Sequence, residues 1–327
     1  MTKLSVLDLV FINEGENANL ALLSSVRIAQ SVENFGYHRI WVAEHHNFPS
    51  IASAATSVVI GHLASKTKAI RVGAGGIMLP NHSPLVIAEQ FGTLESLFPG
   101  RIDLGLGRAP GTDQITLRAL RRDPTSSNNF PEDVKELLFY LGEKVDRASV
   151  QAIPGVGTNV PVWILGSSLF GAQLAAAYGL PYAFASHFAP ASLMDAIEIY
   201  RNNFRPSVYL QKPYLMVSVN VIVQDTDEEA KFLFTSTQQS FTRIVRGTRG
   251  TFPPPISDIE TYWNEHEKEF ASRMLSYSVI GSKDTVSIGL KKILEETRAD
   301  ELMIVTSVYD TDTRIKSLKL LSELDLT

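Results

Sequence analysis

The sequence predicts an α/β protein folded as a (β/α)8 TIM barrel, with long loops after strands 4 and 7. Three observations lead to this prediction. Apolar, β-branched runs alternate with longer stretches of helical periodicity, eight such pairs fit within 327 residues, and no linker rich in proline or serine divides the chain. Such alternation favours a parallel sheet, and eight units suit a closed barrel better than an open doubly wound sheet. We therefore expect a single domain over residues 1–327.

Each predicted strand is a short apolar run. The strands are expected at residues 5–12, 39–43, 70–79, 101–106, 160–165, 181–185, 214–223 and 301–306. The helix within 18–36 should bury Leu20, Leu23, Ile28 and Phe35 on one side and end at Gly36. Loops 107–130 and 247–262 are too long for plain connections. The second loop, which follows the seventh strand and its helix, is predicted to be a lid, the alternative being a surface insertion.

Composition narrows the classes of partner and compartment. Thirty basic and thirty-five acidic residues give a net charge of −5, which argues against binding nucleic acid or an anionic membrane. The absence of cysteine excludes disulfides and thiolate metal sites and fits a cytoplasmic protein. Residues 148–194 carry no Asp, Glu, Lys or Arg, but turns at 166–168 and 179–181 divide this stretch, so we expect no membrane span. The N-terminus reads as a strand, without a signal peptide.

Chemically useful residues follow the predicted strands, and the ends of barrel strands gather on one face. They are Glu44, His45 and His46 after strand two, Gly75 and Gly76 in strand three, Gly107 and Arg108 after strand four, Gly166, Ser167 and Ser168 after strand five, and Ser186, His187 and Phe188 after strand six. These residues predict one site that combines acid–base groups, bare backbone, an arginine and a serine-rich turn.

The turn at 166–168 opens a helix whose free N–H groups and serine hydroxyls favour a phosphate, and Arg108 strengthens that prediction. A plain serine N-cap is the alternative. The stretches 72–80 and 104–111 lack the G-x-G-x-x-G spacing of a dinucleotide site. Their glycines indicate either a flat ligand against the backbone or a bulge.

The adjacent histidines His45 and His46 are expected to point to opposite sides of an extended chain, so they should not share a metal ion. We therefore predict no metal site. One of the two is predicted to act as a general acid or base, the alternative being a structural, hydrogen-bonded histidine.

The segments "WVAEHHN", "VGAGGIMLPNHSPLVIAEQFGTLESLFPGRIDLGLGRAPGTD" and "ILGSSLFGAQLAAAYGLPYAFASHF" together resemble the bacterial luciferase-like flavin-dependent monooxygenases, in particular their stand-alone oxidoreductase branch. The resemblance spans most of the chain. It implies a cytoplasmic oxidoreductase of the paired-donor class, which takes reduced FMN from a separate NAD(P)H:flavin reductase. With O2 the flavin would form a 4a-hydroperoxide that oxygenates an organic substrate.

The same resemblance assigns roles to individual residues. His45 matches the catalytic histidine, and Gly75 and Gly76 match a non-proline cis peptide beside the flavin ring. The residues that match the family's FMN phosphate site are Arg108, Ser167, Ser168 and Gly171. Arg121 and Arg122 are candidates for a second arginine that binds the phosphate.

Several alternatives stay open. The barrel family is shared with enzymes that use the deazaflavin F420 for hydride transfer, and a non-catalytic flavin-binding protein would keep the same fold. A homodimer is implied by the resemblance, and the small residues of 52–66 would allow close helix contact or packing on the protein's own barrel. Phe188, Met78 and Trp163 suggest an uncharged organic substrate, of which a long-chain aldehyde is the family's best-known case.

Overall fold

A computed structural model of the protein describes residues 2–109, 113–146 and 148–326. Eight parallel strands form a closed barrel in the order β1–β2–β3–β4–β5–β6–β7–β9, and β9 pairs back with β1. The predicted (β/α)8 barrel is therefore confirmed. The strands are β1 Lys3–Asp8, β2 Arg39–Val42, β3 Arg71–Met78, β4 Ile102–Gly107, β5 Val162–Gly166, β6 Tyr182–Phe184, β7 Leu215–Val223, β8 Ser278–Gly281 and β9 Glu301–Val305.

All eight predicted strands overlap a barrel strand, whereas β8 was not predicted. It lies outside the ring. It pairs with Asn220–Val223 at the C-terminal end of β7, whereas β9 pairs with Met216–Asn220. Its four residues, "SVIG", are too few to stand out from the flanking helices.

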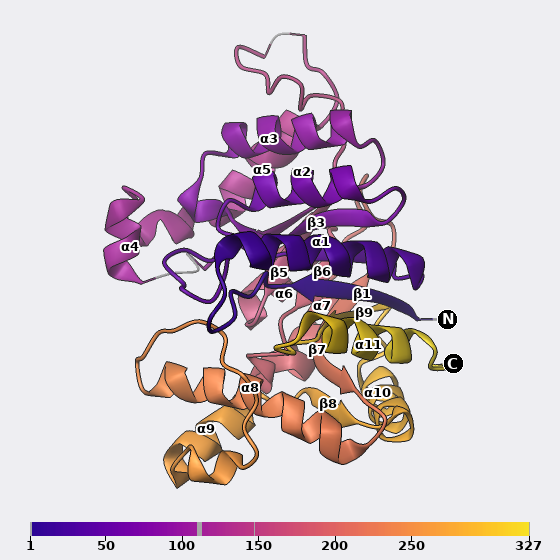
Figure 1. Cartoon of the computed structure of the whole chain (residues 1–327). Helices are drawn as coiled ribbons and strands as arrows, with labels where there is room; N and C mark the ends of the chain where they lie inside the picture. The colour runs from indigo at the N-terminus through magenta and orange to yellow at the C-terminus, as the bar shows by residue number, and fades with distance from the viewer. Residues whose placement is uncertain (1, 110–112, 147, 327) are drawn as a thin grey trace.

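Helices cover the outside of the barrel (Figure 1). The α-helices are α1 Ala18–Asn34, α2 Thr56–Lys66, α3 Pro84–Leu97, α4 Gln114–Ala119, α5 Phe130–Leu141, α6 Leu169–Tyr178, α7 Leu193–Asn202, α8 Asp227–Val245, α9 Glu265–Met274, α10 Lys283–Thr297 and α11 Thr311–Ser322. Short 3-10 turns lie at Leu79–Asn81, Pro124–Asn129, Pro190–Ser192 and Ile259–Thr261. No helix in the described ranges has the length and apolarity needed to span a membrane.

Helix α1 buries a different face from the one the sequence suggested. Its buried residues are Ala21, Ser25, Ile28, Ala29 and Val32. Leu20 and Leu23 are instead 45% and 52% exposed, so their predicted burial is wrong. The reason is that small residues let α1 lie close to the barrel, and this closeness outweighs the burial of two leucines on the adjacent face. The helix does end before Gly36, whose φ of +81° is the left-handed conformation of a C-terminal glycine.

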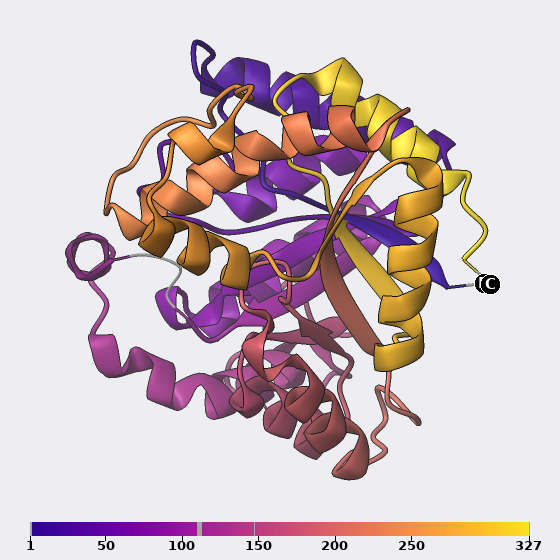
Figure 2. The same cartoon turned by 90° about the horizontal axis from the view of Figure 1, so that it is seen from below.

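The two long loops both reach the end of the barrel where the strands finish, on the left in Figure 1. Loop 107–130 contains α4 and a 3-10 turn, and its residues 110–112 lie outside the described residues. Loop 247–262 connects α8 to α9, within the crossover that follows β7. Figure 2 shows that α8, α9 and the loop between them all lie on one side of the barrel.

Candidate active site

The mouth of the barrel contains a stretch of bare backbone in β3. Gly75 and Gly76 are joined by a non-proline cis peptide bond, as the family resemblance implied. A Cβ atom on Gly76 would lie 2.7 Å from the carbonyl oxygen of Gly105, and one on Gly75 would lie 3.0 Å from the side chains of Leu7 and Trp41. The pairing of β3 with β4 also shifts register here. A side chain at Gly76 would collide with the backbone of β4, and one at Gly75 would press on Leu7 and Trp41, so both positions favour glycine.

Glu44 fastens this segment of β3 to the end of β2. Its backbone N–H donates to Gly76 O at 3.1 Å, and its carboxylate accepts from the Met78 N–H at 2.9 Å. His46 Nε2 and His82 Nε2 approach the same carboxylate at 2.7 and 2.9 Å. Burial alone would raise the pKa of Glu44, but these hydrogen bonds outweigh it and hold the pKa at about 2. Glu44 is therefore an ionised clamp beneath the Gly75–Gly76 backbone.

Glu44, His46 and His82 also have the composition of a two-histidine, one-carboxylate metal site, with ligand atoms within 4.8 Å of one another. These atoms, however, stand at direct hydrogen-bonding distances, and Asn81 Nδ2 adds a further donor at 3.3 Å. The carboxylate lone pairs are thus filled by protein donors. We interpret the cluster as a hydrogen-bonded network that holds the mouth in shape. The network could not be predicted from the sequence, because His82 is 38 residues from Glu44.

His45 and His46 diverge, as the geometry of an extended chain predicted. His46 faces Glu44, whereas the His45 ring lies 5.6 Å from the Phe48 ring, centroid to centroid. Burial lowers the pKa of His45, while the neighbouring Glu44 carboxylate opposes that shift. His45 therefore favours the neutral form, in which one ring nitrogen can accept a proton.

A second histidine, His187, stands beyond the end of β6. Burial lowers its pKa to about 3, and the nearby His45 contributes to the same shift. The position of His187 after strand six predicts its place at the mouth but no role for it.

The predicted phosphate site brings the end of β4 to the start of α6. The Arg108 guanidinium lies 4.1 Å from the centroid of the Phe170 ring, in the first turn of α6. Arg108 has no ion pair to any described residue. Ser168 is the N-cap residue, but its side chain makes no capping hydrogen bond that the structure describes. Ser167 and Ser168 are exposed, whereas Gly171 is buried and its Cα packs on Gly166.

The candidates for a second phosphate arginine differ in their contacts. Arg122 Nε donates to the Asn81 carbonyl at 3.0 Å, which ties the long loop to the segment after β3. Arg121 is exposed and has a φ of +57°. Arg122 thus has a structural contact, and the choice between the two stays a prediction.

The apolar residues expected around the substrate separate into two groups. Phe188 is 39% exposed and lies beside His187, with ring centroids 4.9 Å apart. Trp163 instead packs against Arg39 and Tyr214 near the N-terminal ends of the strands. The expectation that Trp163 lies near the reaction site is therefore wrong, because the side chain of a residue early in β5 points into the floor of the barrel.

Arg249, in loop 247–262, ties this loop to the mouth. Its Nη1 donates to the Asn47 carbonyl at 2.8 Å, and its Nη2 pairs with Asp113 at 2.5 Å. Asn47 Nδ2 also donates to Thr116 Oγ1 at 3.1 Å. Segments after β2, after β4 and after α8 are thus held together beside His45, and no pattern in the sequence indicated this contact.

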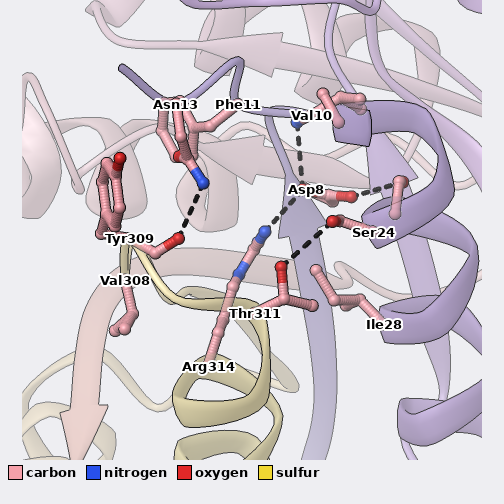
Figure 3. Close-up of a pocket in the computed structure, with 12 residues that line it drawn as sticks. Asp8, Val10, Phe11, Asn13, Ser24, Ile28, Val308, Tyr309, Thr311 and Arg314 are labelled. Atoms are coloured by element: carbon pink, nitrogen blue, oxygen red, sulfur yellow. Dashed lines mark hydrogen bonds and ion pairs between the residues drawn. The ribbon is translucent and has the colours of Figure 1, made fainter. Parts of the chain in front are cut away.

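A small cavity lies between β1, α1 and α11, outside the barrel (Figure 3). The Arg314 Nη1 pairs with the buried Asp8 carboxylate at 2.9 Å, while its Nε and Nη2 have no partner within the described residues. The cavity measures about 20 Å³, which is room for a water molecule but not for a flavin or an organic substrate. This cavity is therefore no candidate for the cofactor or substrate site, and the strand-end residues at the barrel mouth stay the candidate site.

Comparison with known proteins decides the family. Residues 2–299 match the model of the luciferase-like monooxygenases. The chain belongs to this family. A luciferase-like monooxygenase of Escherichia coli (strain K12) is 52% identical over 317 residues, covering 97% of this chain and 95% of that protein. The N-acetyl-S-alkylcysteine monooxygenase of Bacillus subtilis (strain 168) is 30% identical, covering 99% and 98% of the two chains. The family resemblance seen in the sequence is thus confirmed.

Several solved structures share the fold. Apo-MsnO8 superposes with a TM-score of 0.92 at 33% identity, covering 99% of this chain and 98% of that one. The oxygenating constituent of 3,6-diketocamphane monooxygenase from a Pseudomonas putida plasmid, in complex with FMN, gives a TM-score of 0.73 at 16% identity, covering 98% and 97%. An F420-dependent secondary alcohol dehydrogenase gives 0.72 at 15% identity, covering 99% of each chain. The last two show likeness of fold alone.

Proposed function

We propose that this luciferase-like monooxygenase uses reduced FMN and O2 to oxygenate a small, uncharged organic substrate. The observation that carries the proposal is the start of α6 beside Arg108. Helix N–H groups without a side-chain cap attract an anion, and a guanidinium without an acidic partner among the described residues provides the matching charge. A flavin phosphate satisfies both.

The mouth also fits the remainder of FMN. Arg108, Ser167, Ser168 and the N–H of Gly171 would hold the phosphate. The Gly75–Gly76 backbone, which carries no side chain, would support the ring. The Glu44 network keeps this backbone in place through Met78 and Gly76.

Reduced FMN, when bound, supplies the electrons that activate O2, so that one oxygen atom enters the substrate and the other leaves as water. His45 would accept and return a proton at an imidazole nitrogen, because its lowered pKa favours the neutral ring. Phe48 and Phe188 provide apolar surface beside the two histidines, and loop 247–262, held by Arg249, would act as the lid that limits access of water.

Reduced FMN would come from a separate NAD(P)H:flavin reductase, because the chain has no dinucleotide fingerprint of its own. A homodimer is part of the same proposal. Helix α2 packs between α1 and α3, and Val58 on its outer face is 70% exposed. Exposed apolar residues on adjacent helices are typical of a contact surface.

F420-dependent hydride transfer is the second candidate, and the shared fold of the F420-dependent alcohol dehydrogenase supports it. Because F420 also carries a phosphate, the α6 site fits either cofactor. The relatives named monooxygenases favour FMN.

The test is an anaerobic titration of the protein with reduced FMN and, separately, with reduced F420, followed by oxygen uptake measurements. The monooxygenase is supported if FMN binds more tightly than F420 and if a compound from a substrate panel lowers the fraction of consumed oxygen that is released as hydrogen peroxide. Preference for F420 would support the hydride transferase. FMN binding without substrate-dependent oxygen uptake would indicate a non-catalytic flavin-binding protein.

A further inference from the structure

The cavity between β1, α1 and α11 contains a buried arginine that uses only part of its hydrogen-bonding capacity (Figure 3). Arg314 is 5% exposed, and its Nη1 donates to Asp8 Oδ1 at 2.9 Å. Its Nε and Nη2 are buried and have no hydrogen-bond partner in the part of the chain that the structure describes. These two nitrogens form one edge of the guanidinium, and each carries a proton there. Because a buried charged donor needs an acceptor, this edge indicates a ligand.

The Asp8 carboxylate is already occupied by other donors. Its Oδ1 accepts from the Val10 N–H at 3.0 Å as well as from Arg314, and its Oδ2 accepts from Ser25 Oγ at 2.5 Å. The charge of the carboxylate is therefore shared among three donors on one side of the guanidinium. The opposite edge of Arg314, which carries Nε and Nη2, keeps its attraction for an anion.

The other polar groups of the cavity add a further donor. Thr311 Oγ1 donates to Ser24 Oγ at 3.1 Å, which leaves the Ser24 proton for another acceptor. Figure 3 shows the Arg314 side chain extending from α11 into the middle of these lining residues. The remaining wall is apolar and consists of Val10, Phe11, Ala21, Ile28 and Val308. The cavity thus offers two guanidinium N–H groups and one hydroxyl to a ligand that accepts hydrogen bonds.

Size and hydrogen-bonding capacity narrow the class of ligand. The volume of about 20 Å³ holds one particle close in size to a water molecule and excludes sulfate, phosphate and carboxylates. A water molecule would bring two protons of its own, whereas the Asp8 carboxylate, Ser24 Oγ and the Tyr309 carbonyl already accept hydrogen bonds from the protein. A halide ion only accepts, so it matches the donors. Ser24 and Tyr309 are partly exposed, which gives the ion a route to solvent.

We propose that this cavity is a binding site for a small monatomic anion such as chloride, held by Nε and Nη2 of Arg314 and by Ser24 Oγ. The site lies outside the barrel and is independent of the cofactor. The ion would join α11 to α1 beside the loop that follows β1. In that loop the Phe11 ring stacks on the Phe252 ring with centroids 4.3 Å apart, and Asn13 forms a β-bridge with Phe252. A filled cavity therefore also supports the base of loop 247–262.

The first experiment detects the ion directly on the complete wild-type protein, so that no variant has to fold. Crystals grown in sodium bromide should show an anomalous difference peak within hydrogen-bonding distance of Arg314 Nε and Nη2. In solution, the chloride NMR line of potassium chloride should broaden with added protein and narrow again when bromide competes. Density for water without an anomalous peak would overturn the proposal. A peak without broadening in solution would show binding at crystal concentration only and would overturn it as well.

The second experiment assigns the ion to its ligands. Arg314→Lys keeps a cation beside Asp8 but removes the free guanidinium edge, so chloride broadening should be lost. Ser24→Ala removes the hydroxyl from a partly exposed helix position, and the Kd for chloride should rise roughly 2- to 10-fold, the effect of one hydrogen bond. Ser65→Ala on α2 is the matched control and should keep the wild-type Kd. An unchanged Kd in Ser24→Ala, or full broadening in Arg314→Lys, would overturn the assignment.

A bound ion must also stabilise the folded protein, because it binds the folded state and not the unfolded chain. The wild-type urea midpoint should be higher in potassium chloride than in potassium gluconate at equal ionic strength, since gluconate is too large for the cavity. The difference should shrink in Ser24→Ala and persist in Ser65→Ala. Equal midpoints in the two salts, or the same difference in all three proteins, would contradict a specific anion site.

Discussion

The two ends of the barrel treat polar side chains in opposite ways. At the floor, the Arg39 guanidinium forms a bidentate pair with Glu301 and a single bond to Asp103, and both carboxylates receive further donors from Arg71, Trp41, Tyr214 and Ser5. At the mouth, Arg108 and His187 make no side-chain hydrogen bond within the described ranges. The polar side chains of the floor are hydrogen-bonded to one another, whereas some polar side chains of the mouth are left to bind a ligand.

This difference follows from what each end must do. Charges buried without water need complete pairing, because an unpaired charge is very unfavourable there. A binding site gains affinity and catalysis from groups that find their partners only when ligand arrives. Changes at the floor should therefore reduce stability, while changes at the mouth should reduce binding or turnover.

The largest expected effect is at the floor. Arg39→Met leaves Asp103 and Glu301 as buried carboxylates without their shared cation, so the free energy of unfolding should fall by about 3–5 kcal/mol. Urea unfolding measures this loss. Lys283→Ala is the matched control, since its pair with Glu323 is about 43% exposed on both sides and should contribute less than about 1 kcal/mol. Equal losses in the two variants would contradict the comparison.

His45→Ala tests the mouth through chemistry. Because the variant removes the proposed proton carrier, substrate oxygenation should fall roughly 10²- to 10⁴-fold. FMN affinity and the urea midpoint should stay near wild type. The measurement is product formation per flavin oxidised, with His62→Ala on α2 as a histidine control away from the strand ends. Full turnover in the His45 variant would exclude it as the base.

Glu44 is a mouth residue whose buried carboxylate is fully hydrogen-bonded, so it should behave like the residues of the floor. Its pKa is about 2 in the folded protein against an ordinary 4.5. The ionised form therefore adds stability above pH 4.5, and this stability, about 3 kcal/mol in full, is lost as the pH falls from 4.5 to 2. Urea unfolding of wild type and Glu44→Gln at pH 6 and pH 3 checks this. The variant should lose less stability on acidification than wild type. Equal losses in the two proteins would contradict a stabilising role for the ionised Glu44 carboxylate.

Arg108→Ala should weaken reduced FMN binding by roughly 1.5–3 kcal/mol, the range for a charge-assisted contact. Stability should hardly change, because among the described residues Arg108 lies over the Phe170 ring and forms no ion pair or side-chain hydrogen bond. Anaerobic fluorescence titration gives the affinity, and Arg118→Ala on α4 is a charge-matched control. Equal affinity in wild type and the Arg108 variant would remove the phosphate assignment.

The smallest effect is expected at the lid. Arg249→Ala breaks the hydrogen bond to Asn47 and the half-exposed pair with Asp113, which together should contribute about 1 kcal/mol or less to stability. Release of the loop should instead raise the fraction of oxygen that appears as hydrogen peroxide. A peroxide assay during turnover measures that fraction. An unchanged fraction would make the loop a surface insertion.

Much of this molecule could be read from its sequence. Eight apolar runs spaced by helices identify the barrel, because parallel strands buried on both faces must be nearly continuous in apolar residues. The strand-end residues, from Glu44 to His187, could be assigned to one face for the same topological reason. The exposure of Leu20 and Leu23 on α1 and the burial of Trp163 in the floor could not be predicted. The spacing of residues along a helix or strand does not show how closely that element approaches the barrel.

What only the tertiary structure decided is which polar groups meet. Glu44 pairs with His82, and Arg249 bridges to Asp113, and each pair joins segments that are distant in the sequence. The single domain over 1–327 also stays a prediction. The sequence determines the barrel because local periodicity and strand burial act along the chain. The pairing of charges at its two ends depends on distances across the closed barrel, which exist only once it has folded.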